Sequence, residues 1–565
     1  MIYRTEHPNP QFMRKNWTCL NGPWEFEMDH GNSGESRKLF ETSQPFSQTI
    51  HVPFCPESKL SGIGYTDFMA AVWYRRSICV TEDQLQGRVL LHFGAVDFEA
   101  AVYINGKLCG KHKGGYVSFR FDITDYLQPG ENTLTVHATD DTRSGLIASG
   151  KQSDRYESYG CFYTRTTGIW QTVWLEFVPR DYICYANYET DIDRGVLRIT
   201  AQVTGSGVLQ ADAFYEGVPM GSASVASNGG LVHVEIALAQ LHLWEVGHGR
   251  LYDLQLTYGA DQVQSYFGMR SVKLDGYRFL INGKSVFQRL ILDQGFYPDG
   301  IYTAPTDGDL VGDIQRSMDM GFNGARLHEK VFEKRFLYHC DRMGYIVWGE
   351  YPNWGLDHSD PNCIYNVLPE WLEELQRDRN HPSIVGWCPF NETWDHAGRK
   401  QFDGLLSLVY QTTKAVDPSR PCIDTSGNFH VMTDIFDVHN YAQDPKELDK
   451  AYHTLPESIT DRHECRQKYQ KGQPIFVSEY GGIAWSEDPA GWGYGNAPAS
   501  REEFLDRFRG LTDVLLDNPY MFGFCYTQLT DVEQEQNGLY TYGRVPKFDP
   551  EYIAKIVSRK AAIEE

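Results

Sequence analysis

Residues 384–394 have the sequence IVGWCPFNETW, in which Asn391 and Glu392 directly follow an apolar run. A near-continuous apolar run of this length is typical of a strand buried on both faces, as in a parallel sheet. A carboxylate that directly follows such a strand is costly to bury unless it is paired or used. The stretch therefore predicts a parallel β-sheet with a functional carboxylate at its carboxyl end.

Further apolar segments of this kind lie between residue 276 and the C-terminus. Helix-like segments such as 310–320, 369–379 and 501–517 separate them, and this alternation indicates β/α units. Eight strands in about 290 residues is the size of a (β/α)8 barrel. The eight predicted strands are 285–293, 323–328, 345–350, 384–392, 422–427, 437–441, 475–481 and 522–529.

The sequence before residue 276 predicts short strands joined by tight turns. Residues 100–104 form one such strand, and Asn105-Gly106 after it is a strong two-residue hairpin signal. Residues 197–204 alternate apolar and polar side chains, as expected for a sandwich strand. The predicted fold is multidomain, with an N-terminal β jelly-roll sandwich (1–180), an immunoglobulin-like β-sandwich (181–275) and a C-terminal (β/α)8 TIM barrel (276–565).

Composition narrows the class of protein. The net charge of −23 disfavours nucleic acids and anionic membranes as partners, and no apolar run is long enough to span a bilayer. The twelve cysteines show neither C-x-x-C nor zinc-ligand spacing, which favours reduced, buried thiols. The N-terminus lacks an apolar signal core, so we expect a soluble cytoplasmic protein. Aromatic residues, at 14%, suit both sugar stacking and β-sheet cores.

Two glutamates stand at the carboxyl ends of predicted barrel strands, where barrel active sites lie. Glu392 ends strand 4 and Glu479 ends strand 7, so they can face each other across a sugar. One would donate a proton to the glycosidic oxygen while the other attacks the anomeric carbon, with carboxyls about 5–5.5 Å apart in a retaining enzyme. Asn391 is placed to contact the sugar 2-hydroxyl, and Tyr441 to hold Glu479 ionised by a hydrogen bond.

The order of motifs resembles that of glycoside hydrolase family 2, which includes β-galactosidases, β-glucuronidases and β-mannosidases. The resemblance implies that Glu392 is the acid/base, Glu479 the nucleophile and Asn391 the 2-hydroxyl contact. Members of this family often assemble through their sandwich domains, so the resemblance also implies that this chain can form a homo-oligomer. The motifs that carry the resemblance are RNHPSI (379–384), VSEYG (477–481), GFNGAR (321–326), CDRMG (340–344), LNGPW (20–24), HKGGY (112–116) and TGIW (167–170).

Other side chains are expected to line the substrate site. His328 and Tyr441 match positions that often line the pocket in the family, and Glu350 ends strand 3 on the same rim. Trp394 and Trp354 are candidate sugar platforms. No cofactor is expected, and no residues are assigned to a metal.

The residues that select the sugar depart from familiar members of the family. Many β-glucuronidases carry an Asn-x-Lys pair, which grips the uronate carboxylate, before the run equivalent to GLYT (538–541). This chain has EQEQN (533–537) there, without a lysine, and the two acids, Glu533 and Glu535, would repel a carboxylate, which disfavours a glucuronidase. Phe162 stands where related enzymes carry an aspartate, and Asp293 is a candidate to replace that lost acceptor. The leading expectation is a retaining exo-glycosidase of the β-galactosidase type. The alternatives within the family are a β-glucuronidase or β-galacturonidase, or an α-L-arabinofuranosidase or galactofuranosidase.

Two alternatives come from other classes of protein. The first is an inactive carbohydrate-binding protein, which would require a missing carboxylate, and both carboxylates are present. The second is a metal-dependent hydrolase in which His328, Glu350 and His439 meet at the rim, but their spacing is no known ligand motif. The expected partner is therefore an oligosaccharide or other glycoside substrate.

Overall fold

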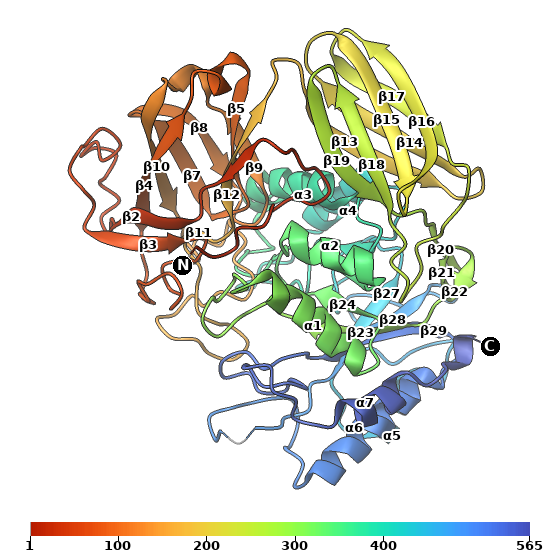
Figure 1. Ribbon diagram of the computed structural model, residues 1–565. Coiled ribbons are helices and arrows are strands. Elements are labelled where there is room, and N and C mark those ends of the chain that lie inside the picture. The colour runs from red at the N-terminus through yellow and green to blue at the C-terminus, as the bar shows by residue number, and fades with distance from the viewer. Residues whose placement is uncertain (1, 487, 565) are drawn as a thin grey trace.

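The computed structural model describes residues 2–486 and 488–564 as two β-sandwiches that border a barrel (Figure 1). The first sandwich is red to orange in the figure, the second is yellow, and the barrel runs from green to blue. The predicted multidomain fold class is confirmed. No helix of the described residues has the length and apolar character needed to cross a membrane.

The N-terminal sandwich packs a four-stranded sheet, β1-β12-β5-β9, against a six-stranded sheet, β3-β2-β4-β10-β7-β8, around an apolar core. The predicted hairpin turn joins β7 to β8, and both of its residues, Asn105 and Gly106, have the positive φ that a tight hairpin turn requires. The strands are β1 (Trp17–Cys19), β2 (Gly22–Met28), β3 (Gln48–Val52), β4 (Ala71–Val80), β5 (Arg88–Phe93), β6 (Val96–Asp97), β7 (Glu99–Ile104), β8 (Lys107–Lys113), β9 (Phe119–Asp122), β10 (Gly130–Thr139), β11 (Gly168–Ile169) and β12 (Val173–Val178).

The second sandwich packs β13-β14-β17 against β16-β15-β18-β19, and its strands bury alternate side chains. A small sheet, β20-β21-β22, then leads into the barrel. The strands are β13 (Ile183–Asp191), β14 (Val196–Val203), β15 (Gly207–Tyr215), β16 (Val218–Ser227), β17 (Gly230–Ala237), β18 (Tyr252–Tyr258), β19 (Asp261–Phe267), β20 (Val272–Asp275), β21 (Arg278–Ile281) and β22 (Lys284–Ser285).

The barrel contains a parallel sheet in the order β26-β25-β24-β23-β29-β28-β27, with helices on its outer side. The predicted helices near 310–320, 369–379 and 501–517 are confirmed as α1, α3 and α6. The barrel elements are β23 (Gln288–Asp293), α1 (Asp307–Asp319), β24 (Gly324–Leu327), α2 (Lys334–Met343), β25 (Ile346–Glu350), α3 (Ile364–Asp378), β26 (Ile384–Cys388), α4 (Asp403–Val416), β27 (Phe436–Asn440), α5 (Pro445–Tyr452), β28 (Ile475–Gly481), α6 (Arg501–Leu516), β29 (Met521–Thr527) and α7 (Pro550–Val557).

The predicted fifth strand, 422–427, is irregular. The Ile423 N–H donates to Trp387 O of β26 at 2.9 Å, and the segment continues beside β26 without forming a regular strand. The chain after it coils around the buried Asp424, whose carboxylate accepts hydrogen bonds from the backbone N–H groups of Val431 and Met432. The described chain forms no helix between residue 427 and β27.

A loop of the first sandwich, residues 140–167 between β10 and β11, lies over the carboxyl end of the barrel. The backbone N–H groups of Ser149 and Gly150 donate to Trp354 O at 2.8 and 3.1 Å. The Tyr163 hydroxyl donates to the Glu535 carboxylate at 2.5 Å. The face where barrel active sites form is therefore partly walled by the other domain.

Candidate active site

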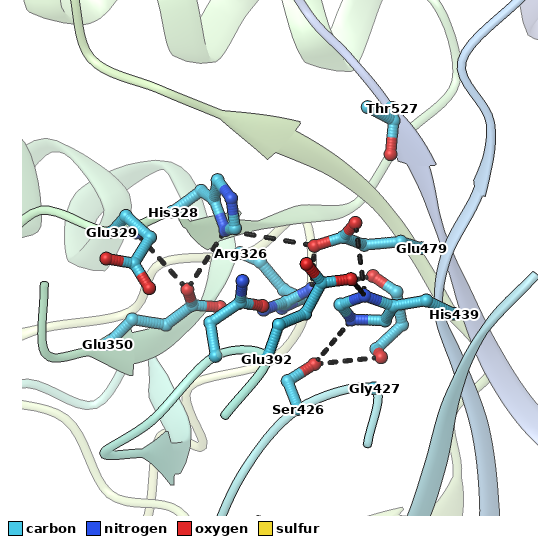
Figure 2. A network of polar contacts seen from close by, with 12 residues as sticks. Arg326, His328, Glu329, Glu350, Glu392, Ser426, Gly427, His439, Glu479 and Thr527 are labelled. Carbon is cyan, nitrogen blue, oxygen red and sulfur yellow. Dashed lines mark hydrogen bonds and ion pairs between the residues drawn. The ribbon is translucent and has the colours of Figure 1, made fainter. Parts of the chain in front are cut away.

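Glu392 and Glu479 converge at the carboxyl end of the barrel (Figure 2). One oxygen of each carboxylate and one ring nitrogen of His439 lie within 4.8 Å of one another. Retaining glycosidases hold their carboxyl groups about 5–5.5 Å apart, whereas inverting enzymes need about 6.5–9.5 Å for a water molecule between them. The separation therefore suits direct attack by a carboxylate on a sugar.

Glu479 is held as an ionised group. Arg326 donates to its Oε1 at 3.0 Å, and the Tyr441 hydroxyl donates to its Oε2 at 2.5 Å, so the predicted bond from Tyr441 is present. Burial raises the pKa of Glu479, but His439, His328 and Arg326 together outweigh burial and leave the pKa below its ordinary value. An ionised, oriented carboxylate is what a nucleophile requires.

Arg326 connects the strands that carry the site. This fully buried side chain of β24 also donates to Glu350 Oε1 at 2.6 Å and to Asn391 Oδ1 at 3.0 Å. The second bond occupies only the Oδ1 atom of Asn391. The Asn391 Nδ2 group has no hydrogen-bond partner among the described residues and is therefore available to a sugar hydroxyl. Removing Arg326 would leave the remaining charges buried without partners. Arg326 therefore fixes the geometry of the site.

Glu392 lies just beyond β26 with a positive φ of 45°, a left-handed conformation that non-glycine residues adopt at a cost and that often marks functional positions. His439 Nδ1 is 2.7 Å from its Oε1. Burial raises the pKa of Glu392, but the bond and the charge of His439, with Lys151 and Arg462 further away, lower it overall. The free protein therefore holds Glu392 mostly ionised.

His439 rests on a chain of buried polar groups. Its Nε2 lies 2.9 Å from Ser426 Oγ, which donates to Asp437 Oδ2 at 2.6 Å. His430 bridges Asp437 and Asp424, and these two acids keep the pKa of His430 well above its ordinary value although burial opposes them. The imidazole between the two glutamates is thus fixed in orientation.

Trp354 forms one wall of the site. Its indole N–H donates to Asn391 O at 3.0 Å, and its backbone N–H donates to Glu329 Oε2 at 3.0 Å. Phe162 of the first sandwich packs on the indole with ring centroids 5.1 Å apart. Lys151 Nζ lies 3.5 Å above the same ring. Aromatic surface and polar groups from both domains therefore meet at this wall.

The predicted site residue Asp293 lies away from the catalytic pair. Asp293 accepts from Gly295 N at 2.9 Å, and the charged groups that influence its pKa are Asp313, Arg544 and Lys330, not the catalytic pair. It shares a strand face with Arg289, which bonds to the C-terminal segment outside the barrel. The prediction that Asp293 reaches the sugar is wrong, because the side chain points toward the helix layer.

The other predicted residues differ in their access to a ligand. His328 is buried beside Glu350 and Glu479, and burial followed by the charge of Lys151 holds its pKa well below the ordinary range. Glu350 uses both oxygens on Arg326, His328 and the backbone, so it supports the site instead of reaching a sugar. Trp394 is 43% exposed and packs edge-on against Phe429, so its platform role remains a prediction.

Sequence reasoning missed several residues of the site. Arg326 carried a detectable signal, since an arginine inside an apolar strand requires a buried partner. For His439 the sequence indicates only a possible metal ligand. Lys151 and Glu329 follow no sequence pattern, because their positions depend on how loops dock.

The metal-ligand alternative receives little support from the geometry. Among the described residues, His328, Glu350 and His439 do not form a group able to share a cation, whereas Glu392, His439 and Glu479 do. Both oxygens of Glu479 already accept hydrogen bonds, and the Arg326 guanidinium beside them repels a cation.

Comparisons with known proteins indicate the same family for different parts of the chain. Residues 17–177 match the model described as glycosyl hydrolases family 2, sugar binding domain, and residues 272–487 match the family's TIM barrel domain. A β-glucuronidase of Paenibacillus borealis is 25% identical over 94% of this chain and 94% of its own length. The human β-glucuronidase is 25% identical over 85% of this chain and 79% of its own length.

Solved structures share the whole fold. A β-glucuronidase from an uncultured Clostridium species superposes with a TM-score of 0.79 at 21% identity, covering 99% of this chain and 100% of that one. A Bifidobacterium dentium β-glucuronidase complexed with coumarin-3-O-glucuronide gives a TM-score of 0.80 at 21% identity, with 97% and 98% covered. At this identity the likeness concerns the fold alone.

Proposed function

This chain belongs to glycoside hydrolase family 2 and is a retaining glycosidase, and we propose that it is an exo-acting β-uronidase with β-glucuronides as its main substrates. The observation that carries the chemistry is the short separation of Glu392 and Glu479, with Arg326 and Tyr441 holding Glu479 ionised. The choice of glycone is supported by the β-glucuronidases among the relatives.

The reaction proceeds by two displacements. Glu479 attacks the anomeric carbon, the glycosidic C–O bond breaks, and Glu392 gives its proton to the leaving oxygen. Water then attacks the glycosyl ester of Glu479 while Glu392 takes up a proton from it. Glycosylation removes the negative charge of Glu479, which favours the ionised form of Glu392 when it acts as a base.

The leading expectation from sequence was a β-galactosidase, and the relatives support the uronide alternative instead. The sequence objection to a uronide was the pair of acids, Glu533 and Glu535, that would repel a carboxylate. Both are engaged with the first sandwich, since Glu533 accepts from Thr164 N at 3.1 Å and Glu535 accepts from Tyr163 at 2.5 Å. Burial also raises the pKa of Glu535, which weakens the repulsion.

Exo action is supported by the loop that closes one side of the site. Phe162 and Lys151 stand against Trp354, and a long glycan would collide with this wall. A single terminal sugar fits such a blocked site better than an internal one.

A panel of 4-nitrophenyl glycosides tests the proposal. It comprises the β-glucuronide, β-galacturonide, β-glucoside, β-galactoside, β-mannoside and α-L-arabinoside. The proposal expects the highest kcat/KM for a β-uronide and loss of that activity in Glu479→Gln. A clear preference for a neutral glycoside would contradict the glycone, and unchanged turnover by Glu479→Gln would contradict the mechanism.

A further inference from the structure

We propose that Lys151, which belongs to the N-terminal sandwich and not to the barrel, binds the carboxylate of the substrate's uronate sugar. The inference rests on the proposed function and names the residue that selects the charged glycone. It also assigns the first sandwich a direct part in substrate recognition.

Lys151 is a buried cation without an anionic partner. The residue is 4% exposed. Among the described residues its ammonium donates no hydrogen bond and has no carboxylate oxygen within 4.0 Å, and it lies over the Trp354 ring at 3.5 Å. Burial lowers its pKa, but Cys161 and acidic groups that include the ionised Glu479 raise the pKa overall, so the charge is retained. A buried charge is expensive unless something pairs with it, and a ligand carboxylate supplies that pair.

The backbone on both sides of Lys151 is fixed in place. Gly150 has a φ of 55°, and a side chain there would come within 2.5 Å of Glu329 O, so the loop lies directly on the barrel. Gln152 Nε2 donates to Asp97 Oδ2 at 2.7 Å, and its Oε1 accepts from Thr166 N at 2.8 Å. Because the backbone at Lys151 is fixed before the ligand arrives, the entropic cost of binding is reduced.

Lys151 lies close to the position of the reacting sugar. Trp354, on which it stacks, is bonded to the backbone of Asn391, the residue next to Glu392. Lys151 also influences the pKa values of Glu392 and His328, so it stands within electrostatic reach of the catalytic groups. An ammonium in this position can hold the far side of a sugar whose anomeric carbon faces Glu479.

The acids around Lys151 are suited to a negative ligand. Burial raises the pKa of Glu329 well above its ordinary value and also raises that of Glu535. The Oε1 atom of Glu329 is buried without a hydrogen-bond partner. A protonated carboxyl group at Glu329 can donate to a carboxylate, whereas an ionised group would repel it.

The experiment compares two substrates that differ at the sugar carboxylate, 4-nitrophenyl β-D-glucuronide and 4-nitrophenyl β-D-glucoside. Lys151→Met keeps a stem that packs on Trp354 and removes the ammonium. Loss of a buried charge partner predicts a fall of at least about 50-fold in kcat/KM for the glucuronide. The glucoside, which makes no such contact, is expected to lose much less, so the preference for the glucuronide over the glucoside falls. Arg155→Gln removes an exposed cation from the same loop and is expected to match wild type on both substrates.

The outcomes separate the two proposals. Wild-type protein without activity on any β-uronide contradicts the proposed function. Wild type that cleaves the glucuronide, together with a Lys151→Met protein of unchanged substrate preference, contradicts the role of Lys151 alone. If the variant fails to fold in thermal melts, a crystal structure of wild type with D-glucuronic acid decides. A carboxylate oxygen within about 3.2 Å of Lys151 Nζ supports the inference, and a carboxylate held elsewhere overturns it.

Discussion

His439 Nδ1 lies between the two carboxylates, 2.7 Å from Glu392 Oε1 and 3.3 Å from Glu479 Oε2. One imidazole therefore contacts both groups that the reaction requires. The contact holds the carboxylates close together, as double displacement demands. It also lowers the pKa of both glutamates in the free protein.

Glu392→Gln is expected to show a strong dependence on the leaving group. General acid catalysis contributes about 10²- to 10⁴-fold, so hydrolysis of phenyl β-glucuronide should fall by that factor. A dinitrophenolate departs without a proton, and its glycosylation step should fall much less. Pre-steady-state rates on the two aryl glucuronides measure the difference. Equal losses on both would argue against an acid role for Glu392.

Tyr441→Phe is expected to reduce kcat/KM by about 10- to 100-fold, because a hydrogen bond to a charged group contributes about 1.5–3 kcal/mol. Removing a donor from ionised Glu479 raises its pKa. Since the nucleophile must be ionised, activity is lost as pH falls through that pKa, and the acid limb of the pH profile should move to higher pH.

Tyr480→Phe is the matched control for Tyr441→Phe, because the Tyr480 hydroxyl lies 2.9 Å from Thr512 in the helix layer, on the opposite face of the same strand as Glu479. This variant should keep the wild-type pH profile. An unshifted acid limb in Tyr441→Phe would show that its bond does not tune Glu479.

The bound uronate should change the protonation of Glu392. Glu392 must carry a proton, so activity is lost as pH rises through its pKa, which is lowered in the free protein. A substrate carboxylate beside Lys151 adds a negative charge that offsets the positive charge of Lys151, and this raises the pKa of Glu392. The basic limb of kcat, which reports the complex, should therefore lie at higher pH than that of kcat/KM, which reports the free enzyme. Coincident limbs for the glucuronide would contradict this coupling.

The sequence could predict the residues that follow apolar strands. Glu392, Glu479, Asn391 and Tyr441 all stand at strand ends, and the barrel topology gathers those ends on one rim. The same logic failed for Asp293, because neighbouring residues of a strand face opposite sides and the boundary of the strand decides which side is the pocket. The irregular course of the fifth strand was not predicted either, because periodicity does not show where a buried carboxylate such as that of Asp424 bonds to the backbone.

Lys151 could not be predicted from sequence for a different reason. It lies in a long loop without apolar periodicity, and its position follows from contacts with Trp354 and Glu329 of another domain. Such contacts join residues that are far apart in the chain, so neither strand pattern nor local motif indicates them. The loop that completes the site is visible only once the domains are packed.

Asp293→Asn tests the correction to the predicted site. Because Asp293 points away from the pocket, kcat/KM should stay within about 3-fold of wild type. Burial, with the charge of Asp313, raises its pKa to about 6. The pKa of an aspartate in the unfolded chain is about 4. Wild type therefore loses stability as pH rises from about 4 to about 6, whereas the variant, whose side chain is neutral, does not. Thermal melts at pH 4.5 and 7.5 should show the variant gaining relative stability, by roughly 1–3 kcal/mol, at the higher pH. A large loss of activity would restore Asp293 as a substrate contact.

The most direct test of the account follows the anomeric proton by NMR during hydrolysis of 4-nitrophenyl β-D-glucuronide. Retaining chemistry on Glu392 and Glu479 predicts that β-D-glucuronic acid appears first and then mutarotates to the equilibrium mixture. Appearance of the α-anomer first would contradict the double displacement, and no hydrolysis of this substrate at all would contradict the proposed glycone.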